Sequence, residues 1–207
     1  EKIEDYIEVI ERLAPQKGID GFELNISCPN VSKGGISFGT DAELIRDITA
    51  EARRAADGKV LMVKLTPLVT DISVMAEAAI DAGADALSLV NTFTGMVVDI
   101  ESKQAVLANR TGGLSGPAIR PMAVYLVNKV YREVAQPAGI PILGLGGISS
   151  GSDAVEFMLA VASAVAVGTA SFVEPDSCVN IAQGMEHYCR RQGFSKVSEL
   201  TGLMERI

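Results

Sequence analysis

The sequence predicts an α/β protein in which parallel strands alternate with helices. Strand-like runs such as residues 60–67 are apolar almost throughout, as expected for strands covered on both faces. Between them, apolar residues recur at helical spacing, and glycines such as Gly58 and Gly83 end these segments. The 207 residues are 48% apolar, which is enough to bury a sizeable core and indicates a globular chain.

The first elements are a helix, a strand and a second helix. Residues 2–13 carry apolar side chains at helical spacing among acidic ones, and residues 21–27 form the first strand. The glycine-rich loop that follows runs for about ten residues, a length that is usually functional between a strand and a helix. Thr40 and Glu43 then form a capping box, so a helix is expected to begin there.

The middle of the chain continues this alternation and then departs from it. A strand at residues 60–67 leads to a helix at residues 71–82 and a third strand at residues 86–90. Residues 96–109 contain two short β-rich runs, which we interpret as a hairpin inserted over the active face.

The last part of the chain returns to strand-helix units. Pro121 suits the first turn of a helix that ends near residue 135. The expected elements after it are a strand at residues 141–147, a helix at 152–162, a strand at 164–167 and a helix at 176–192.

An internal repeat indicates the architecture. Residues 82–90 resemble residues 160–168, and repeated helix-strand joints are typical of a β/α barrel. Five strand-helix units are visible, whereas a closed (β/α)8 barrel has eight. The sequence therefore predicts about the last five units of a (β/α)8 TIM barrel with an inserted β-hairpin. We assign residues 1–207 to the carboxyl-terminal part of a single domain.

A sheet of five strands on its own would leave two edges and an apolar inner face in water. We therefore expect that the first strands were removed, are unresolved, or come from another chain.

Charge and hydropathy argue against two classes of partner. The net charge is −8 and no dense basic run occurs, which is the opposite of what binding to a phosphate backbone requires. The longest apolar run, residues 154–167, contains Glu156 and falls short of the roughly 20 residues that span a bilayer. We expect neither nucleic acid nor a membrane as a partner.

The three cysteines indicate a reducing compartment. An odd count without a disulfide signature is simplest to explain in the cytoplasm. There is no Cys-x-x-Cys pair and His187 is the only histidine, so we expect no metal site in this chain.

The stretch around Cys28 combines side chains that core packing does not require. Asn25, Cys28 and Asn30 collect where the first strand runs into a Pro-Asn turn, and ligands of parallel α/β folds lie at such carboxyl ends. Cys28 is the candidate general base or acid, although a thiol with its ordinary pKa of about 8.5 needs surroundings that stabilise the thiolate. The alternative is a buried, inert thiol.

Lys64 and three asparagines also stand at predicted strand ends. Lys64 interrupts an apolar strand, where it can place a cation beside a ring that gains negative charge on reduction. A structural lysine that reaches to the rim is the alternative. The amides of Asn25, Asn30 and Asn91 suit a planar ring with alternating carbonyl and NH groups, although each alone is more often a turn or capping residue.

Two glycine-rich strand ends form a candidate phosphate site. Gly146 and Gly147 end one strand, and Gly168 and Thr169 end the next. Backbone amides at such positions can approach a phosphate closely, and the last two strands of β/α barrels often form a phosphate site. Ordinary glycine turns are the alternative.

Together, six motifs resemble class 1 dihydroorotate dehydrogenase. They are Asn25-Ile26-Ser27-Cys28-Pro29-Asn30, Val63-Lys64-Leu65, Val90-Asn91-Thr92, Gly113-Leu114-Ser115-Gly116, Gly146-Gly147-Ile148 and Gly168-Thr169. The resemblance implies an FMN-containing (β/α)8 barrel, a flavoprotein oxidoreductase that converts dihydroorotate to orotate in pyrimidine (UMP) biosynthesis. Cys28 matches the base that removes the C5 proton as hydride passes to the flavin.

The same resemblance implies roles for the other residues. The pyrimidine would be held by Asn25, Asn30, Asn91 and Thr92, and the flavin by Asn25, Lys64, Val90, Gly116, Gly146, Gly147, Gly168 and Thr169. The amino-terminal lysine and asparagine of the family have no counterpart in this chain. Val161 stands at a helix end where the family commonly has glycine.

Residues 87–96 and 112–116 look most like the B-type enzymes of this family. That similarity implies a homodimer and a separate subunit with FAD and a [2Fe-2S] cluster that passes electrons to NAD, with a direct acceptor such as fumarate as the alternative. Two other functions remain open. One is another FMN barrel acting on pyrimidines, such as the dihydropyrimidine dehydrogenase module, and the other is a non-catalytic, truncated half-barrel that binds phosphate.

Overall fold

The fold is built on one parallel sheet of five strands in the order β1-β2-β3-β8-β9. A computed structural model describes residues 2–27 and 38–206. The strands are β1 (Gly21–Asn25), β2 (Val60–Leu65), β3 (Ala86–Leu89), β8 (Ile142–Leu145) and β9 (Ala164–Ala166). All four neighbouring pairs are parallel, which confirms the predicted α/β class and the five strands.

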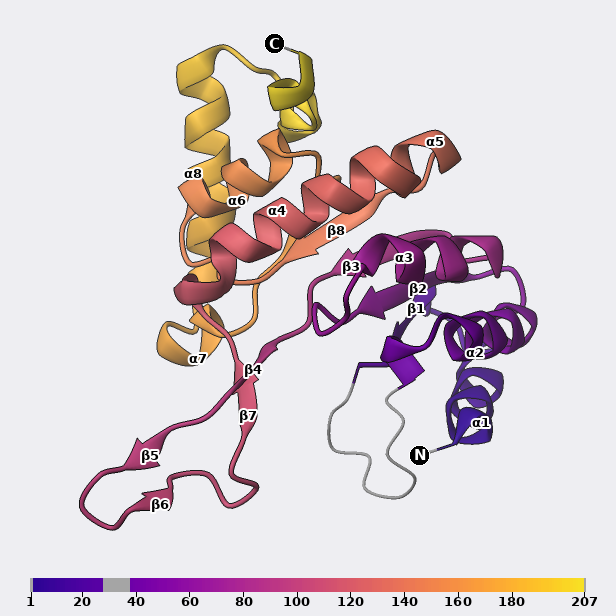
Figure 1. The fold of residues 1–207 in the computed structure, drawn as a ribbon. Coiled ribbons are helices and arrows are strands. Elements are labelled where there is room, and N and C mark those ends of the chain that lie inside the picture. The colour runs from indigo at the N-terminus through magenta and orange to yellow at the C-terminus, as the bar shows by residue number, and fades with distance from the viewer. Residues whose placement is uncertain (1, 28–37, 207) are drawn as a thin grey trace.

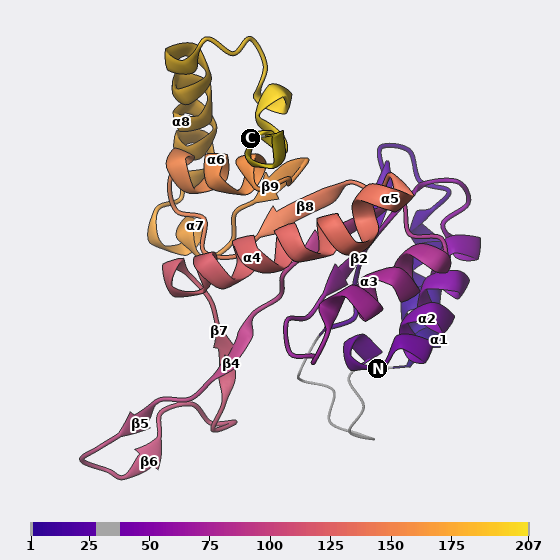
Figure 2. The ribbon, with the colours of Figure 1, turned by 45° about the horizontal axis from the view of Figure 1, so that its top comes forward.

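The helices form a layer on one side of this sheet (Figures 1 and 2). They are α1 (Ile3–Leu13), α2 (Ala42–Ala55), α3 (Ile72–Asp81), α4 (Arg120–Val130), α5 (Gln136–Ala138), α6 (Gly151–Leu159), α7 (Ala170–Val173) and α8 (Ser177–Gln192). Short 3-10 turns cover Phe38–Thr40, Pro117–Ile119, Val197–Leu200 and Leu203–Arg206. In the described part of the chain, no helix is long and apolar enough to cross a membrane.

The strands alternate between a helix-covered face and an inner face. Leu61, Val63 and Leu65 of β2 are fully buried, whereas Met62 and Lys64 between them are only partly buried. The register aligns Lys64 with Asn25 on one side and with Ser88 on the other. We define the inner face as Glu23, Asn25, Met62, Lys64, Ala86, Ser88, Leu143, Leu145, Ala164 and Ala166.

The sheet is open, with β1 and β9 as its two edge strands. Among the described residues, the helices lie against the other face, and the inner face carries no helical layer (Figures 1 and 2). Polar Asn25 and the apolar edge residue Ala164 are accordingly exposed. This one-sided arrangement resembles an arc of a β/α barrel.

The start of α2 differs from the prediction. Asp41, not Thr40, caps this helix, because the Asp41 carboxylate accepts hydrogen bonds from the amides of Glu43 and Leu44 at 2.8 and 3.2 Å. Asp41 has the extended backbone of a cap residue, whereas Thr40 closes the preceding 3-10 turn. The predicted capping box is therefore wrong by one residue. A carboxylate also suits the positive end of the helix dipole better than a hydroxyl does.

The helix predicted to end near residue 135 extends further. It continues from α4 through a π-helical turn, Tyr131–Ala135, into α5 and ends at Gly139 with φ +69°. Pro137 has no amide hydrogen, so regular helical bonding cannot pass this point, and Gln136 instead donates to the Tyr131 carbonyl. The proline widens the helix here without ending it.

Residues 93–114, which we call the arm, form the predicted hairpin. Strand β4 (Phe93–Gly95) pairs with β7 (Gly112–Leu114), and β5 (Val98–Asp99) pairs with β6 (Gln104–Ala105), both antiparallel. The arm leaves the carboxyl end of β3 but extends away from the sheet (Figures 1 and 2). The expectation that it covers the active face is therefore wrong, because these short ladders bond only to each other.

The internal repeat is visible in the backbone. Gly83 and Val161 follow α3 and α6 at equivalent positions and have φ values of +100° and +111°. A β-branched residue is unfavourable in this region, at a cost of about 1–3 kcal/mol. Val161 nevertheless keeps the glycine-type turn, and its side chain is fully buried.

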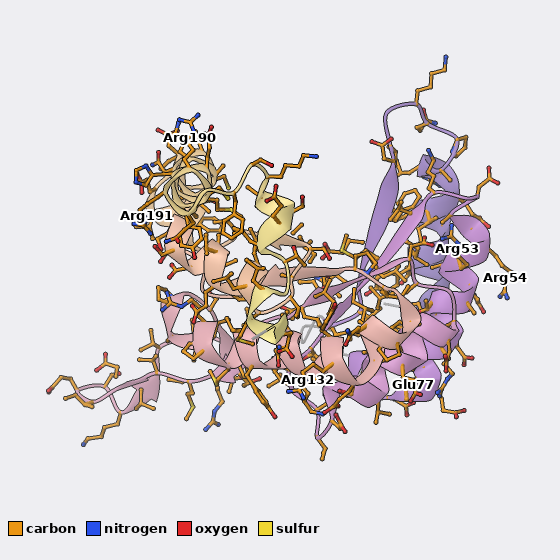
Figure 3. The ribbon with its side chains drawn as sticks, turned by 90° about the horizontal axis from the view of Figure 1, so that it is seen from above. Arg53, Arg54, Glu77, Arg132, Arg190 and Arg191 are labelled. Carbon is orange, nitrogen blue, oxygen red and sulfur yellow. The ribbon has the colours of Figure 1, made fainter. Side chains whose placement is uncertain are left out.

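Arginines on the outer helices tie the helix layer to the sheet. Arg53 of α2 pairs with Asp85 at 2.5 Å and donates to the Lys59 carbonyl at 2.6 Å. Asp85 also accepts from the Leu61 amide at 2.8 Å, so one carboxylate joins α2 to two strands. Figure 3 shows Arg53 and Arg54 at one side of the molecule and Arg190 and Arg191 at the other.

A second ion-pair cluster joins α3 to α4. The Lys129 ammonium lies 3.1 Å from Asp71 Oδ1 and 2.5 Å from Glu133 Oε2, and the Ser73 hydroxyl donates to Glu133 at 2.6 Å. Hydrogen bonds from Lys129 hold the pKa of Asp71 and the pKa of Glu133 below their ordinary values. Glu133 and Asp71 in turn raise the pKa of Lys129.

We expect Lys129→Met to lower the urea midpoint of the protein near neutral pH. Folding lowers both carboxyl pKa values, so their contribution to the free energy of unfolding is present at neutral pH and is lost below about pH 4. The difference between wild type and variant should therefore shrink as the pH falls from about 6 to 3. Urea unfolding followed by circular dichroism at several pH values measures it.

Lys17→Met is the matched control, since Lys17 is exposed and has no ion pair among the described residues. A Lys129→Met difference that stays constant over this pH range would contradict the assignment.

Candidate active site

A cavity of about 480 Å³ lies at the carboxyl ends of the strands. This volume is typical of small-molecule sites. Nine of the twelve predicted site residues line it, namely Lys64, Val90, Asn91, Thr92, Gly116, Gly146, Gly147, Gly168 and Thr169. Residues separated by more than a hundred positions therefore meet at one mouth, because parallel strands end at the same edge.

Asn25 joins the site through a hydrogen bond. The Asn91 side-chain amide donates to Asn25 Oδ1 at 3.1 Å, and Asn91 Oδ1 accepts from the Thr92 amide at 2.8 Å. The Tyr6 hydroxyl donates to the Asn25 carbonyl at 3.2 Å and so connects α1 to the end of β1. The bond from Asn91 engages the Asn25 side-chain oxygen, so the Asn25 amide lies beside a residue that lines the cavity.

Lys64 brings a cation into the cavity rather than to the outer rim. Its side chain is 21% exposed and its ammonium lies 3.6 Å from Glu23 Oε1 on the inner face. The Ser27 hydroxyl donates to the Lys64 carbonyl at 3.1 Å, which joins the ends of the first two strands. A positive charge held here can stabilise negative charge that develops on a bound ring.

The loops after the arm and after β8 touch at glycines. Gly116, Gly146 and Gly147 have φ values of +86°, +128° and +78°, which other residues rarely adopt. A Cβ atom on Gly147 would lie 2.7 Å from the Gly116 carbonyl oxygen. Only glycine at position 147 allows the two loops to approach this closely.

Backbone amides beside these loops are available to an anion. Among the described residues, the amides of Gly147, Ile148 and Gly168 donate to no acceptor. The Thr169 hydroxyl donates to Ser115 Oγ at 2.8 Å and links the β9 end to the base of the arm. Unpaired amides at strand ends next to helix starts are the usual components of phosphate sites.

Sequence reasoning missed several lining residues. Ser115, Ser149, Val173, Glu174 and Ser177 line the cavity. Ser115 lies within one identified motif and Ser149 directly follows another, so their position was a usable signal. Helix α7, which leads to the other three, has only four residues and is too short for periodicity to indicate.

Two predicted residues lie outside the described part of the chain. Cys28 and Asn30 fall within residues 28–37, so their roles stay predictions. Ser27, which precedes Cys28, is buried and lies beside the carboxyl end of β2.

The arrangement suits a flat, conjugated ligand with an anionic tail. Apolar walls come from Val90, Ile119, Leu145 and Val167, while Lys64 and the amide pair supply polar contacts at one end. The amides of Gly147 and Gly168 supply anion contacts at the other.

Comparison with known proteins supports this description. Residues 1–189 match the family described as dihydroorotate dehydrogenase. The dihydroorotate dehydrogenase B (NAD(+)) catalytic subunit of Pelobacter propionicus is 54% identical over 202 residues, covering 98% of this chain and 65% of that protein. The subunit of the same name from Geotalea daltonii is 49% identical over 203 residues, with coverage of 98% and 65%.

A solved structure shares the fold. The crystal structure of the dihydroorotate dehydrogenase of Eimeria tenella in complex with ferulenol matches with a TM-score of 0.81 at 25% identity, covering 99% of this chain and 58% of that chain. The chain spans about 65% of the length of its curated relatives. On the extent of the family match, this chain belongs to the dihydroorotate dehydrogenase family.

Proposed function

We propose that residues 1–207 are the carboxyl-terminal part of a single FMN-binding (β/α)8 barrel that oxidises dihydroorotate to orotate in pyrimidine biosynthesis. The observation that carries this proposal is the cavity in which Lys64, Asn91 and the glycine loops meet, with Asn25 hydrogen-bonded to Asn91. In the whole protein, further strands would pair with β1 and β9 and enclose the inner face.

The residues present fit FMN. Gly168 has no protein atom within 4 Å of the position of a Cβ, and its φ is not in the left-handed region. The protein itself therefore does not require glycine there, whereas a phosphate on the Gly168 amide would. Gly146, Gly147 and Thr169 would complete the phosphate grip, and Val90 and Gly116, which line the cavity, would hold the flavin. When bound, FMN supplies a hydride acceptor.

Lys64 and the asparagines are proposed to act on different reactants, Lys64 on the flavin and the asparagines on the pyrimidine. The Lys64 cation stabilises negative charge on the ring that receives the hydride. Asn25, Asn91 and Thr92 orient the pyrimidine through its alternating carbonyl and NH groups, and Asn30 is proposed to join them on the basis of sequence.

Cys28 is proposed to remove the C5 proton of dihydroorotate. A positioned base of this kind contributes typically about 10²- to 10⁴-fold to the rate. The hydrogen bond between Ser27 and Lys64 supports the proposal, because the residue before Cys28 is thereby held beside the cavity.

The partners are proposed from the B-type relatives. Their name, dihydroorotate dehydrogenase B (NAD(+)) catalytic subunit, supports transfer of electrons to NAD and the presence of a second subunit. That this subunit carries FAD and a [2Fe-2S] cluster is proposed from the sequence resemblance alone. We also propose a homodimer and a cytoplasmic location.

The direct test uses the full-length protein. It should purify yellow, and anaerobic dihydroorotate should bleach the flavin absorbance. A protein that stays colourless and unresponsive after FMN addition would count against an enzyme and favour a non-catalytic half-barrel. Turnover of uracil or thymine in place of dihydroorotate would identify a different pyrimidine-reducing flavin barrel.

Cys28→Ala should retain FMN but slow flavin reduction by dihydroorotate by about 10²-fold or more, because the proton at C5 loses its acceptor. Stopped-flow absorbance measures the reductive step. Cys178→Ala is the control, since Cys178 is exposed, does not line the cavity, and has its Sγ 3.7 Å from Ser171 Oγ. An unchanged rate in Cys28→Ala would remove Cys28 from the mechanism.

Gly168→Ala and Gly147→Ala should have different effects, the first on FMN affinity and the second on the stability of the fold. Gly168→Ala should leave the melting temperature unchanged and weaken FMN binding by about tenfold or more, since its methyl group enters open space that the phosphate needs. Gly147→Ala should destabilise the fold by about 2–4 kcal/mol, because the methyl group meets the Gly116 carbonyl and φ is positive. Thermal unfolding and fluorescence titration distinguish the two. Unchanged FMN affinity in Gly168→Ala would contradict the proposed grip.

A further inference from the structure

We propose that Asp153 is a positioning residue that holds the two glycine loops together and thereby sets the affinity for the FMN phosphate. This inference rests on the proposed function. It concerns a side chain that does not line the cavity, so Asp153 would act through the loops and not by contact with the cofactor.

Both carboxylate oxygens of Asp153 are engaged. Oδ2 accepts from the Ser149 amide at 3.0 Å and from the Ser149 hydroxyl at 2.9 Å. Oδ1 pairs with the Arg120 guanidinium. The Asp153 amide donates to Ser150 Oγ at 3.2 Å, which caps α6, and Asp153 is only 7% exposed. One nearly buried carboxylate thus binds the loop after β8 and the first residue of α4.

Asp153 joins the loop after β8 to the start of α4, and the spacing of these two elements determines the geometry of the proposed anion site. Arg120 follows the turn that begins at Gly116, and a Cβ on Gly147 would lie 2.8 Å from Arg120 Cβ and 2.9 Å from Arg120 N. Gly147 therefore sits between the Gly116 carbonyl and the start of α4. Asp153 stabilises this contact, because its carboxylate binds both Ser149 of the loop after β8 and Arg120 at the start of α4.

The chemistry requires a carboxylate and not an amide. Asp153 faces only donors, namely the Ser149 amide, the Ser149 hydroxyl and the guanidinium. Asparagine would present an NH2 group to one of them and leave a buried donor without a partner. Since the donors belong to both loops, their separation is expected to relax.

Loss of the Asp153 contacts is expected to affect binding of the phosphate and not binding of the flavin ring. Lys64 and the Asn25–Asn91 pair, which would contact the ring and the pyrimidine, are not bonded to Asp153 or Arg120 among the described residues. Relaxed loops would therefore weaken contacts to the phosphate and leave contacts to the ring intact. FMN and riboflavin differ only by the phosphate, so they report on this difference.

The test is the affinity of full-length apoprotein for both flavins, measured by fluorescence quenching. Asp153→Asn should raise the Kd for FMN by about 10- to 100-fold, the range typical of lost supporting hydrogen bonds at ligand sites. Its Kd for riboflavin should change less than about twofold, which also shows that the variant is folded. Glu156→Gln is the matched control, because Glu156 pairs with Arg120 at 3.0 Å but does not contact Ser149, and it should retain the wild-type FMN affinity.

Unchanged FMN affinity in Asp153→Asn would overturn the inference, and so would an equal loss of FMN and riboflavin from a folded variant. If Asp153→Asn does not fold, Arg120→Lys answers the same question. It keeps the charge but loses the planar guanidinium that reaches Asp153 and Glu156 through separate nitrogens, so the ratio of FMN to riboflavin affinity must fall, and an unchanged ratio overturns the inference. Failure of the proposed function is distinguishable, because it would appear in the wild type as absent FMN binding or absent reduction by dihydroorotate.

Discussion

The parallel register of the five strands is the constraint on which the rest of the structure depends. Each strand is hydrogen-bonded to its neighbour in the same direction, so every carboxyl end reaches one edge of the sheet. Lys64, Asn91, Gly147 and Gly168 each follow or end a different strand, and this register brings them to one cavity, with Asn25 of β1 hydrogen-bonded to Asn91. A shift of one residue in β1 or β2 would turn Asn25 or Lys64 toward the helix layer.

Close backbone contacts at the mouth add a second constraint. The Gly116 carbonyl and the start of α4 leave no room for a side chain at Gly147, which makes the distance between two loops a property of the backbone itself. The same fold tolerates a non-glycine residue elsewhere, since Val161 adopts a glycine-type φ of +111° behind the sheet. Packing of a fully buried valine can offset such strain, whereas steric exclusion at Gly147 cannot be offset in this way.

Strand and helix positions could be predicted because burial alone determines their patterns. The apolar run ending at Lys64 and the glycine stops at Gly58 and Gly83 identified elements and the candidate site together. Other features could not be predicted, because the sequence allowed more than one local structure or carried no pattern. Asp41 and Thr40 are both good cap residues, and the backbone decides between them. The direction of the arm depends on which ladders its strands join, and the four-residue α7 has no period to detect.

The described part of the site has two regions, the anion region and the region near Lys64, and different contacts hold each of them in place. The anion region is built from the loops after the arm, after β8 and after β9, and the described chain holds them with Arg120, Asp153 and the Thr169–Ser115 bond. The region near Lys64 opens onto the inner face, and β1 is an edge strand of the described sheet. Under the proposed function, cofactor retention and redox chemistry would depend on separate sets of contacts. Because Asp153 bonds only within the anion region, a change there can alter phosphate affinity while the groups that face the ring keep their positions.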